Sequence, residues 1–272
     1  PNGDKNGLKS PAMKDFFLTT NLEYLLKKFN FETTSTNLED IYSELHDNPK
    51  YKDELKVLDE AIYNYFSRLV LPNEPTIYDM LLLGLTNNDL IATFNWDPLL
   101  IQAYIRCSSI TTNLPKMAFL HGNVALGYCP DCLQIGVMGI PCPKCSKPFI
   151  KLDLLFPIKN KKYTDNKLIK SFWDETKEFI KNASMITVFG YGAPITDVEA
   201  ISLFKSAWGD LQHRSNEEFS FINLEDEETC VAKWNKFVYT HHYRYSNNFF
   251  DSYIALFPRR SCQVELATHH FN

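Results

Sequence analysis

No run of apolar residues in the chain approaches the roughly 18 residues that a membrane-spanning helix requires. The N-terminal stretch PNGDKNGLKSPAMKDFF has no apolar core, so it does not resemble a signal peptide. Basic residues are not in excess either, because 28 Lys and Arg stand against 33 Asp and Glu, for a net charge of −5. The chain is therefore not expected to span a membrane or to bind nucleic acid directly as its main role.

Internal repeats and low-complexity segments are also absent from the 272 residues. The length suits one large domain, or one domain with a sizeable insertion. Hydrophobic residues make up 44% of the chain and aromatic residues 14%, which is enough to bury a substantial core. Since no signal peptide is found, we expect a cytoplasmic protein in a reducing compartment, whose cysteines are thiols or metal ligands.

The spacing of apolar residues changes about a third of the way along the chain, and this change predicts the fold class. Residues 12–30, 37–47 and 51–70 have apolar side chains at three- and four-residue intervals, which predicts helices. Beyond them, the short apolar runs LIATF, MAFLHG, LDLLF, MITVF and FSFIN alternate with helical stretches such as NKLIKSFWDETKEFIKNA and TDVEAISLFKSAW. Such alternation predicts an α/β fold, a Rossmann-like parallel sheet with helices on both faces. The predicted organisation is one domain over 1–272 with a helical insertion over 20–85.

Four of the seven cysteines form two CxxC pairs, YCPDC and PCPKC, separated by nine residues. Each CxxC turn directs two thiolates toward one point, and tetrahedral zinc takes four such ligands. We therefore predict a zinc-ribbon module over residues 127–148, with two disulfides as the alternative. Four thiolates leave no open coordination position, so this Zn²⁺ would be structural rather than catalytic. The predicted ligands are Cys129, Cys132, Cys142 and Cys145, whereas Cys107, Cys230 and Cys262 are isolated and expected in the core.

Five motifs follow one another between residues 90 and 226. They are TFNWD, LHG, the two cysteine pairs, VFGYGAPITD and FINLED. In this order they resemble the sirtuin-like family of NAD-consuming proteins. LDLLFPIKNKKYTDN, followed by a helix that contains Trp173, is more similar to the divergent prokaryotic branch of antiphage defence than to protein deacetylases. The resemblance implies a Rossmann-like fold that takes NAD as its substrate.

The resemblance also implies a segment that the sequence does not contain. The family's first strand and its Gly-rich phosphate loop are expected just before NGLKSPAMKDFF, where only Gly3 and Gly7 stand. We therefore expect residues to be missing upstream of the chain, and we assign pyrophosphate binding to none of the residues present.

Asn95 and Asp97 lie on either side of an aromatic residue, directly after the first predicted strand. From spacing alone, Asn95 could simply end that strand, and Asp97 before Pro98 could cap a helix. The resemblance implies instead that both line a nicotinamide pocket. Asn95 would then orient the ribose or the attacking water, and Asp97 would accept a hydrogen bond from the carboxamide of nicotinamide.

His121 ends the run MAFLHG, immediately before the cysteine module. A lone histidine after a strand is commonly a surface or capped residue. Its ordinary pKa of about 6.5 nevertheless suits proton transfer at neutral pH. The resemblance implies that His121 is the general base.

Gly190 and Gly192 follow the predicted strand MITVF, where glycine allows a positive φ or the close approach of a ligand. The resemblance favours cofactor binding for both, with Asp197 as a further candidate. The second half of the motif is also a helix capping box, because Thr196 and Glu199 have the T-x-x-E spacing, and this alternative is purely structural.

Asn223 and Glu225 follow the next predicted strand, FSFIN. Ligands of open α/β sheets bind outside the carboxyl ends of the strands, so we assign both residues to cofactor binding. Asn223 would bind the adenosine ribose, and the alternative is that it forms a simple turn.

Cleavage of nicotinamide from NAD passes through an oxocarbenium-like centre, as glycoside hydrolysis does. The reaction needs a fixed ribose, a polar contact to the leaving amide and a nearby base. The leading hypothesis is an NAD glycohydrolase that makes nicotinamide and ADP-ribose and depletes NAD in antiphage defence. The alternatives are an NAD-dependent protein deacylase and a non-catalytic module that binds NAD or ADP-ribose.

A freely active NAD hydrolase would kill its own cell, so its activity must be conditional. Since the catalytic core uses most of the chain, we expect sensing in trans, through self-assembly or a regulatory protein partner. The helical insertion and the aromatic segment HHYRYSNNFFDSYIALF are the expected docking surfaces. Core packing is the alternative for that segment, because Phe249, Tyr253 and Phe257 would fall on one face of a helix.

Overall fold

The computed structural model describes residues 5–156, 166–192, 198–209, 218–234 and 243–270. Within these ranges, no helix is both long and apolar enough to cross a membrane. Contacts between residues divide the chain into two compact units, and the predicted α/β class is confirmed by their helices and parallel strands. The predicted limits of the single domain, its insertion and its zinc module stay predictions. Unit 1 comprises Pro1–Thr76, Thr93–Ala103 and Phe119–Lys170, and unit 2 comprises Ile77–Ala92, Tyr104–Ala118 and Ser171–Asn272.

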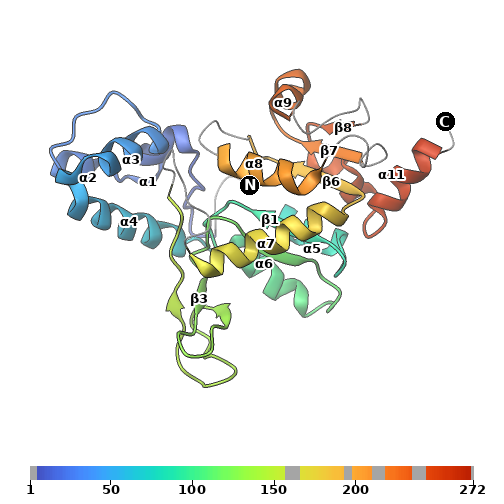
Figure 1. Cartoon of the computed structure of the whole chain (residues 1–272), viewed down its shortest axis with the longest axis horizontal. Helices are drawn as coiled ribbons and strands as arrows, with labels where there is room; N and C mark the ends of the chain where they lie inside the picture. Colours follow the sequence, from blue (N-terminus) through green and yellow to red (C-terminus); the bar gives the residue numbers. More distant parts are fainter. Residues whose placement is uncertain (1–4, 157–165, 193–197, 210–217, 235–242, 271–272) are drawn as a thin grey trace. The chain divides into compact units, whose positions relative to one another are not determined.

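The N-terminal part of unit 1 is helical, and Figure 1 shows α1 to α4 gathered into one group. The helical segments predicted over 37–47 and 51–70 are confirmed, and the one predicted over 12–30 is present as three short helices. Asn21 adopts the left-handed conformation, with a φ of 57°, which Asn tolerates better than most residues and which ends a helix. The elements are η1 (Met13–Asp15), α1 (Phe16–Thr20), α2 (Glu23–Lys28), α3 (Leu38–Asp47), η2 (Pro49–Tyr51) and α4 (Lys52–Ser67).

Helix α4 turns its predicted apolar face into the core of this group. Leu58, Ile62 and Phe66 are buried there, at the spacing that places side chains on one side of a helix. The same core includes Trp96 and Leu154, which come from later segments of unit 1. The helical group therefore shares one core with the segment that carries Asn95 and Asp97.

Strands β1 (Leu90–Thr93) and β2 (Lys116–Phe119) pair with each other, and helix α6 (Leu99–Ser108) connects them. The N–H of Lys116 donates to the carbonyl of Asp89 and the N–H of Leu120 to that of Thr93, both at 2.9 Å. Because both bonds have the same offset along the chain, the strands run parallel. The strands predicted from LIATF and MAFLHG are confirmed.

The cysteine module follows β2 and contains the short antiparallel strands β3 (Leu126–Tyr128), β4 (Ile135–Val137) and β5 (Ile150–Lys151). The strand predicted from LDLLF is wrong, because β5 ends before it. Those residues extend along the loop after β2 instead, where the N–H of Leu155 donates to the carbonyl of His121 at 2.9 Å.

Unit 2 is built on a parallel sheet in the order β6-β7-β8, so the strands predicted from MITVF and FSFIN are confirmed. Every residue of the central strand β7 is buried, and Phe219 and Phe221 pack with Trp208 and Trp234 from two helices. The helices predicted from NKLIKSFWDETKEFIKNA and TDVEAISLFKSAW are also present. The elements are α5 (Ile77–Gly84), α7 (Lys167–Asn182), β6 (Met185–Phe189), α8 (Val198–Trp208), β7 (Glu218–Ile222), α9 (Glu227–Trp234), β8 (Tyr243–Ser246), η4 (Phe249–Asp251), α10 (Tyr253–Leu256) and α11 (Ser261–His270).

The prediction that Phe249, Tyr253 and Phe257 share one helical face is wrong. Ser252 has an extended backbone, and its side chain accepts a hydrogen bond from the N–H of Ala255, so a new helix begins there. Phe249 lies before this break and is buried in the core of unit 2, next to Ile222. The aromatic segment therefore contributes partly to the core, which is the alternative that its pattern left open.

Asp59 of α4 generates a prediction about pH. Burial raises the pKa of its carboxyl group above the usual 3.8, although the hydroxyl of Tyr42 donates to it at 2.7 Å. A raised pKa in the folded state means that stability falls as pH rises through the window above 3.8. Asp59→Asn keeps an acceptor for Tyr42 and removes the charge. Its melting temperature relative to wild type should rise between about pH 3 and about pH 7 in thermal denaturation.

Asp53→Asn is the matched control on the same helix. The ammonium group of Lys56, 2.8 Å away, lowers the pKa of the exposed Asp53 carboxyl, so its contribution has the opposite sign. The relative melting temperature of this variant should fall slightly over the same pH range. If the relative melting temperatures of both variants changed with pH in the same direction, the raised pKa assigned to Asp59 would be contradicted.

Candidate functional site

The segment after β1 and the segment after β2 are joined by hydrogen bonds to three consecutive carbonyl groups. The side-chain amide of Asn123 donates to the carbonyls of Asp97, at 2.6 Å, and Asn95, at 3.4 Å. Between them, the carbonyl of Trp96 accepts the backbone N–H of Val124 at 2.9 Å. We call the Asn123 side chain and the Val124 backbone the clasp. The clasp fixes the two predicted site segments against each other within unit 1.

Asp97 is 4% exposed, and its Oδ1 atom accepts the N–H of Leu99 at 3.0 Å, just where α6 begins. Burial raises the pKa of its carboxyl, and the hydrogen bond from Leu99 opposes that shift. Asp97 therefore caps α6, which is one of the two roles that the sequence left open. Asn95 is exposed by contrast, and its N–H donates to the hydroxyl oxygen of Thr93 at 3.1 Å.

His121 is buried, with 7% of its surface exposed, which differs from a residue at a solvent-facing strand end. Its ring packs edge-on against Phe94, with the ring centroids 4.7 Å apart. The next residue, Gly122, has a φ of +78°, and a Cβ there would lie 2.6 Å from the carbonyl oxygen of Asp153. Glycine is therefore required for the turn that places His121 beside Phe94.

Trp96, between the two polar candidates, points into the core rather than joining them. Its ring packs edge-on against Phe66 at 5.6 Å and lies 5.4 Å from the ring of Phe156. The indole N–H is buried and has no hydrogen-bond partner among the described residues. Trp96 thus anchors this segment of the chain in the hydrophobic core.

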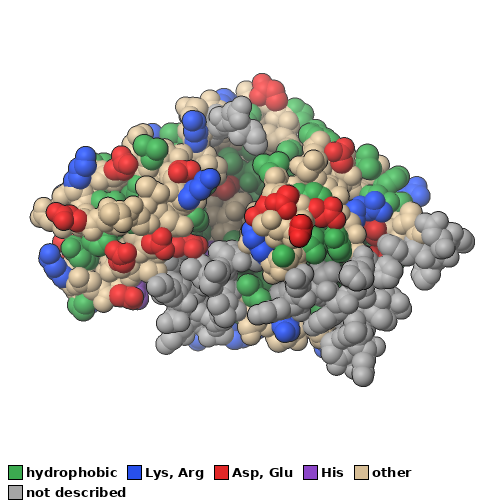
Figure 2. Space-filling view, turned by 90° about the horizontal axis from the view of Figure 1, so that it is seen from above, with side chains coloured by type: hydrophobic (Ala, Val, Ile, Leu, Met, Phe, Trp, Pro, Cys, Tyr) green, Lys and Arg blue, Asp and Glu red, His purple; other side chains and the backbone are tan. Residues whose placement is uncertain are grey.

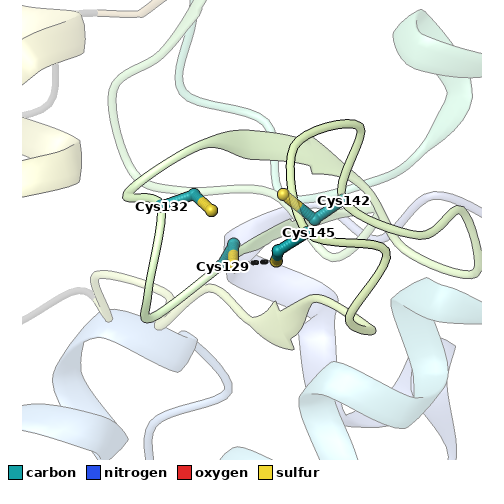
Figure 3. A group of neighbouring side chains, drawn as sticks. All are labelled: Cys129, Cys132, Cys142 and Cys145. Atoms are coloured by element: carbon teal, nitrogen blue, oxygen red, sulfur yellow. Dashed lines mark hydrogen bonds between the residues drawn. The ribbon is translucent and has the colours of Figure 1, made fainter.

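The four predicted zinc ligands converge in unit 1, as Figure 3 shows. Their sulfur atoms all lie within 4.8 Å of one another, and those of Cys129 and Cys145 are 3.4 Å apart. Sulfur atoms around a tetrahedral zinc at about 2.3 Å are about 3.8 Å from one another, so the cluster fits this ion. No disulfide is present, because all four are free thiols. The cluster could hold a structural Zn²⁺ ion.

The two CxxC turns have the same backbone geometry. In the first, the N–H of Leu133 donates to the carbonyl of Cys129, and in the second the N–H of Ser146 donates to that of Cys142, both at 2.8 Å. Leu133 and Ser146 are both left-handed, with φ of 53° and 60°. Burial alone would raise the pKa of the Cys142 thiol. Hydrogen bonds from the N–H groups of Lys144 and Cys145 and from neighbouring thiols outweigh it and lower that pKa to about 7, which favours the thiolate.

A small core supports the zinc module. The ring of Phe149 lies over β4, where a Cβ added at Gly136 would come within 2.3 Å of it. Gly136 therefore leaves room for the aromatic ring, and its partner across β3 and β4, Gly127, leaves room for Met138 and the carbonyl of Ile150. Outside the module, Cys107 and Cys230 are buried as predicted, and Cys262 is half-buried.

The second group of candidates lies in unit 2, at the carboxyl edge of the β6-β7-β8 sheet. The N–H of Gly190 donates to the carbonyl of Ile222 at 2.9 Å, and that of Asn223 donates to the carbonyl of Ser246 at 3.0 Å. Gly190 has a φ of +63°, and a Cβ at either Gly190 or Gly192 would meet no described residue within 4 Å. The glycines are therefore open at this edge, which is where ligands of parallel sheets bind.

Asn223 forms the turn that the sequence left as an alternative. Its Oδ1 atom accepts the N–H of Glu225 at 3.2 Å, and its carbonyl accepts the hydroxyl of Tyr245 at 2.9 Å. Glu225 pairs with Lys233 at 2.6 Å. Both candidates thus have structural partners within unit 2. Asp197 and Thr196, with the capping box that includes Thr196, lie outside the described residues.

Sequence reasoning missed Asn123 and Tyr63. The hydroxyl of Tyr63 on α4 donates to the carbonyl of Val124, the backbone part of the clasp, at 2.9 Å. Asn123 follows the LHG motif directly, and this adjacency was the one available signal. Nothing in the spacing of apolar residues relates Tyr63 to a residue 61 positions later.

No protein-family model and no curated protein match the chain. Solved structures of Sir2 proteins do match. A Sir2 homologue in complex with NAD is 14% identical, with a TM-score of 0.42, and the match covers 90% of this chain and 86% of that one. A mutant Sir2 homologue with ADP-ribose is 12% identical, with a TM-score of 0.43 and coverage of 91% and 90%.

A third match is Sir2 with the inhibitor EX-527, 2'-O-acetyl-ADP-ribose and a deacetylated p53 peptide. It is 16% identical, with a TM-score of 0.40, and the match covers 81% of each chain. At these low identities and TM-scores no residue role is transferred, and function rests on the chain's own residues.

We predict about one zinc ion per chain in freshly purified, reduced protein, measured by metal analysis. Cys142→Ser should lose the ion and lower the melting temperature, because metal binding and folding of such a module are coupled. Cys262→Ser, which changes a half-buried thiol outside the module, is the control and should keep the zinc. The metal assignment would be overturned if the wild-type protein contained no zinc and its melting temperature were the same with and without added zinc.

Proposed function

We propose that the chain is an NAD glycohydrolase, which cleaves the bond between nicotinamide and ribose to give nicotinamide and ADP-ribose. The observation that carries the proposal is the clasp. Its hydrogen bonds hold the backbone of Asn95 and Asp97 against the segment that carries His121. A reaction through an oxocarbenium-like centre depends on such fixed relative positions of base and binding groups. The order of the sequence motifs supports NAD as the substrate.

Each residue receives a role that its surroundings permit. The buried ring of His121 accepts a proton from the attacking water, and Asn95 orients that water or the ribose. The Oδ1 atom of Asp97 caps α6, so we assign its second oxygen to the carboxamide of nicotinamide. We assign cofactor binding to Gly190, Gly192, Asn223 and Glu225 of unit 2 as a separate proposal, which rests on their place at the carboxyl edge of its sheet. Zn²⁺ on the four cysteines stabilises the module without entering the reaction.

The deciding experiment is incubation of the full chain with NAD, with and without an acetylated peptide, followed by chromatography of the products. Free ADP-ribose formed without peptide supports the hydrolase. Acetylated ADP-ribose formed only with peptide would show a deacylase instead. Binding of NAD without any product would show a non-catalytic module.

We predict that His121→Gln lowers the rate of NAD cleavage by about 10²- to 10⁴-fold, the usual contribution of a general base. Gln is chosen because His121 is buried, and alanine would leave a cavity. Asn95→Ala should also abolish turnover, at little cost in stability, since Asn95 is exposed. His46→Gln changes an exposed histidine of α3 and should cleave NAD at the wild-type rate. Wild-type turnover by His121→Gln would remove His121 from the mechanism.

We further propose that NAD depletion serves antiphage defence in the cytoplasm, and that self-assembly or a regulatory protein activates the enzyme in trans. The helical group of unit 1 offers a docking surface. Tyr24 and Val57 are exposed there, and both line a groove beside α4. Figure 2 shows acidic, basic and apolar side chains interspersed over this group.

This control predicts that the activity per chain depends on protein concentration. The isolated protein at high dilution should cleave NAD slowly, and the rate per chain should rise as the protein assembles or meets its partner. Rate measurements over a dilution series, with the mass of the species determined by light scattering, would test this. Full activity of a dilute monomer, unchanged by concentration, would contradict control in trans.

A further inference from the structure

The proposed base and the proposed binding groups lie on two separate segments, and their relative position depends on a small set of contacts. Within unit 1, Asn123 is fully buried, and its side chain bonds to backbone groups of both segments. Its Nδ2 atom donates to the carbonyls of Asn95 and Asp97, and its Oδ1 atom accepts the N–H of Ala125 at 2.9 Å. Serine, threonine or leucine at this position could not make all three bonds.

Helix α4 reaches the same contacts from the helical group. Tyr63 donates its hydroxyl to the carbonyl of Val124, whose N–H is bonded to Trp96. The Tyr63 phenol is a donor at neutral pH, since the ordinary pKa of tyrosine is 10.0 and burial raises it further. The ammonium group of Lys151 lies 4.9 Å from the centre of the Tyr63 ring and also pairs with Glu60 one turn earlier, which holds the ring in place.

We propose that Asn123 and Tyr63 are positioning residues, which set His121 against Asn95 and Asp97 and through which α4 acts on the reaction. The proposal rests on the proposed NAD hydrolase function. Neither residue contacts the substrate in this scheme. A change at either should lower kcat for NAD cleavage more than it raises KM, because it alters the alignment of the reacting groups and removes no group that contacts the substrate.

A pair of tyrosines on α4 provides a matched test. Tyr63→Phe removes the hydroxyl that binds Val124, and Tyr65→Phe removes a hydroxyl that donates to the carbonyl of Lys9 at 2.7 Å. Both changes delete one hydrogen bond from the same helix to a backbone carbonyl. Tyr63→Phe should lower kcat by about three- to tenfold, the factor that corresponds to the net free energy of one such hydrogen bond when it is lost from the transition state. Tyr65→Phe should lose comparable thermal stability and retain the wild-type kcat.

A second readout does not require turnover. The ring of Phe94 lies 4.7 Å from that of His121. The ring current of Phe94 is therefore expected to change the NMR chemical shifts of the protons bonded to carbon in the His121 ring. With ¹³C-labelled histidine, and with His121→Gln to assign the signal, Tyr63→Phe and Asn123→Ser should both move it. Tyr65→Phe and Thr20→Ala should not, although Thr20 is a buried residue of the same unit.

The outcomes separate the two proposals. If the wild-type chain cleaves no NAD, the proposed function fails, and the His121 signal still decides whether Asn123 and Tyr63 position the ring. If the wild type cleaves NAD and the two tyrosine variants have equal kcat and an unmoved His121 signal, the positioning proposal alone is overturned. A fall in kcat with a moved signal for Tyr63→Phe, absent in Tyr65→Phe, supports it.

Discussion

The hydrogen bonds from Asn123 and Val124 to three consecutive carbonyl groups are the constraint on which unit 1 depends. A loop after a strand has few partners of its own, and its buried carbonyls must be satisfied by other groups. Here they are satisfied by one amide side chain and one backbone N–H from the loop after the neighbouring strand. The two loops are therefore held together as one piece, and its residue Trp96 packs in the core of the helical group.

Burial then gives the polar residues of this piece different properties. Asp97 and His121 are almost fully removed from water, whereas Asn95 is exposed. A buried carboxyl next to a helix N-terminus experiences opposing effects, since burial disfavours its charge and the backbone N–H groups favour it. Such an environment suits a group that exchanges hydrogen bonds with a neutral amide, as the proposed role of Asp97 requires.

Local patterns in the sequence predicted those features that depend on local structure. The spacing of the CxxC pairs was enough to predict a four-cysteine cluster, because each turn closes within five residues. The apolar periodicity of α4 predicted its buried face through Leu58 and Ile62 for the same reason.

The errors came where a single residue or a distant contact decides the outcome. Asn21 and Ser252 interrupt helices that periodicity alone would continue. LDLLF is apolar enough for a strand, yet its backbone bonds to the loop of His121. The contact between Tyr63 and Val124 joins residues far apart in sequence, and no periodic pattern contains that information. The burial of His121 was missed because it depends on the same folded loop.

The cysteine module has a consequence for the loop that carries His121. Its strands have two or three residues each, too few to be stable in water without the cluster beside them. Strand β3 begins three residues after Asn123, and the N–H of Leu126 donates to the carbonyl of Asn123 at 3.1 Å. The module and the loop that carries His121 are therefore joined through the backbone. Loss of a metal ion from the cysteine cluster would be expected to loosen this loop as well as the module itself.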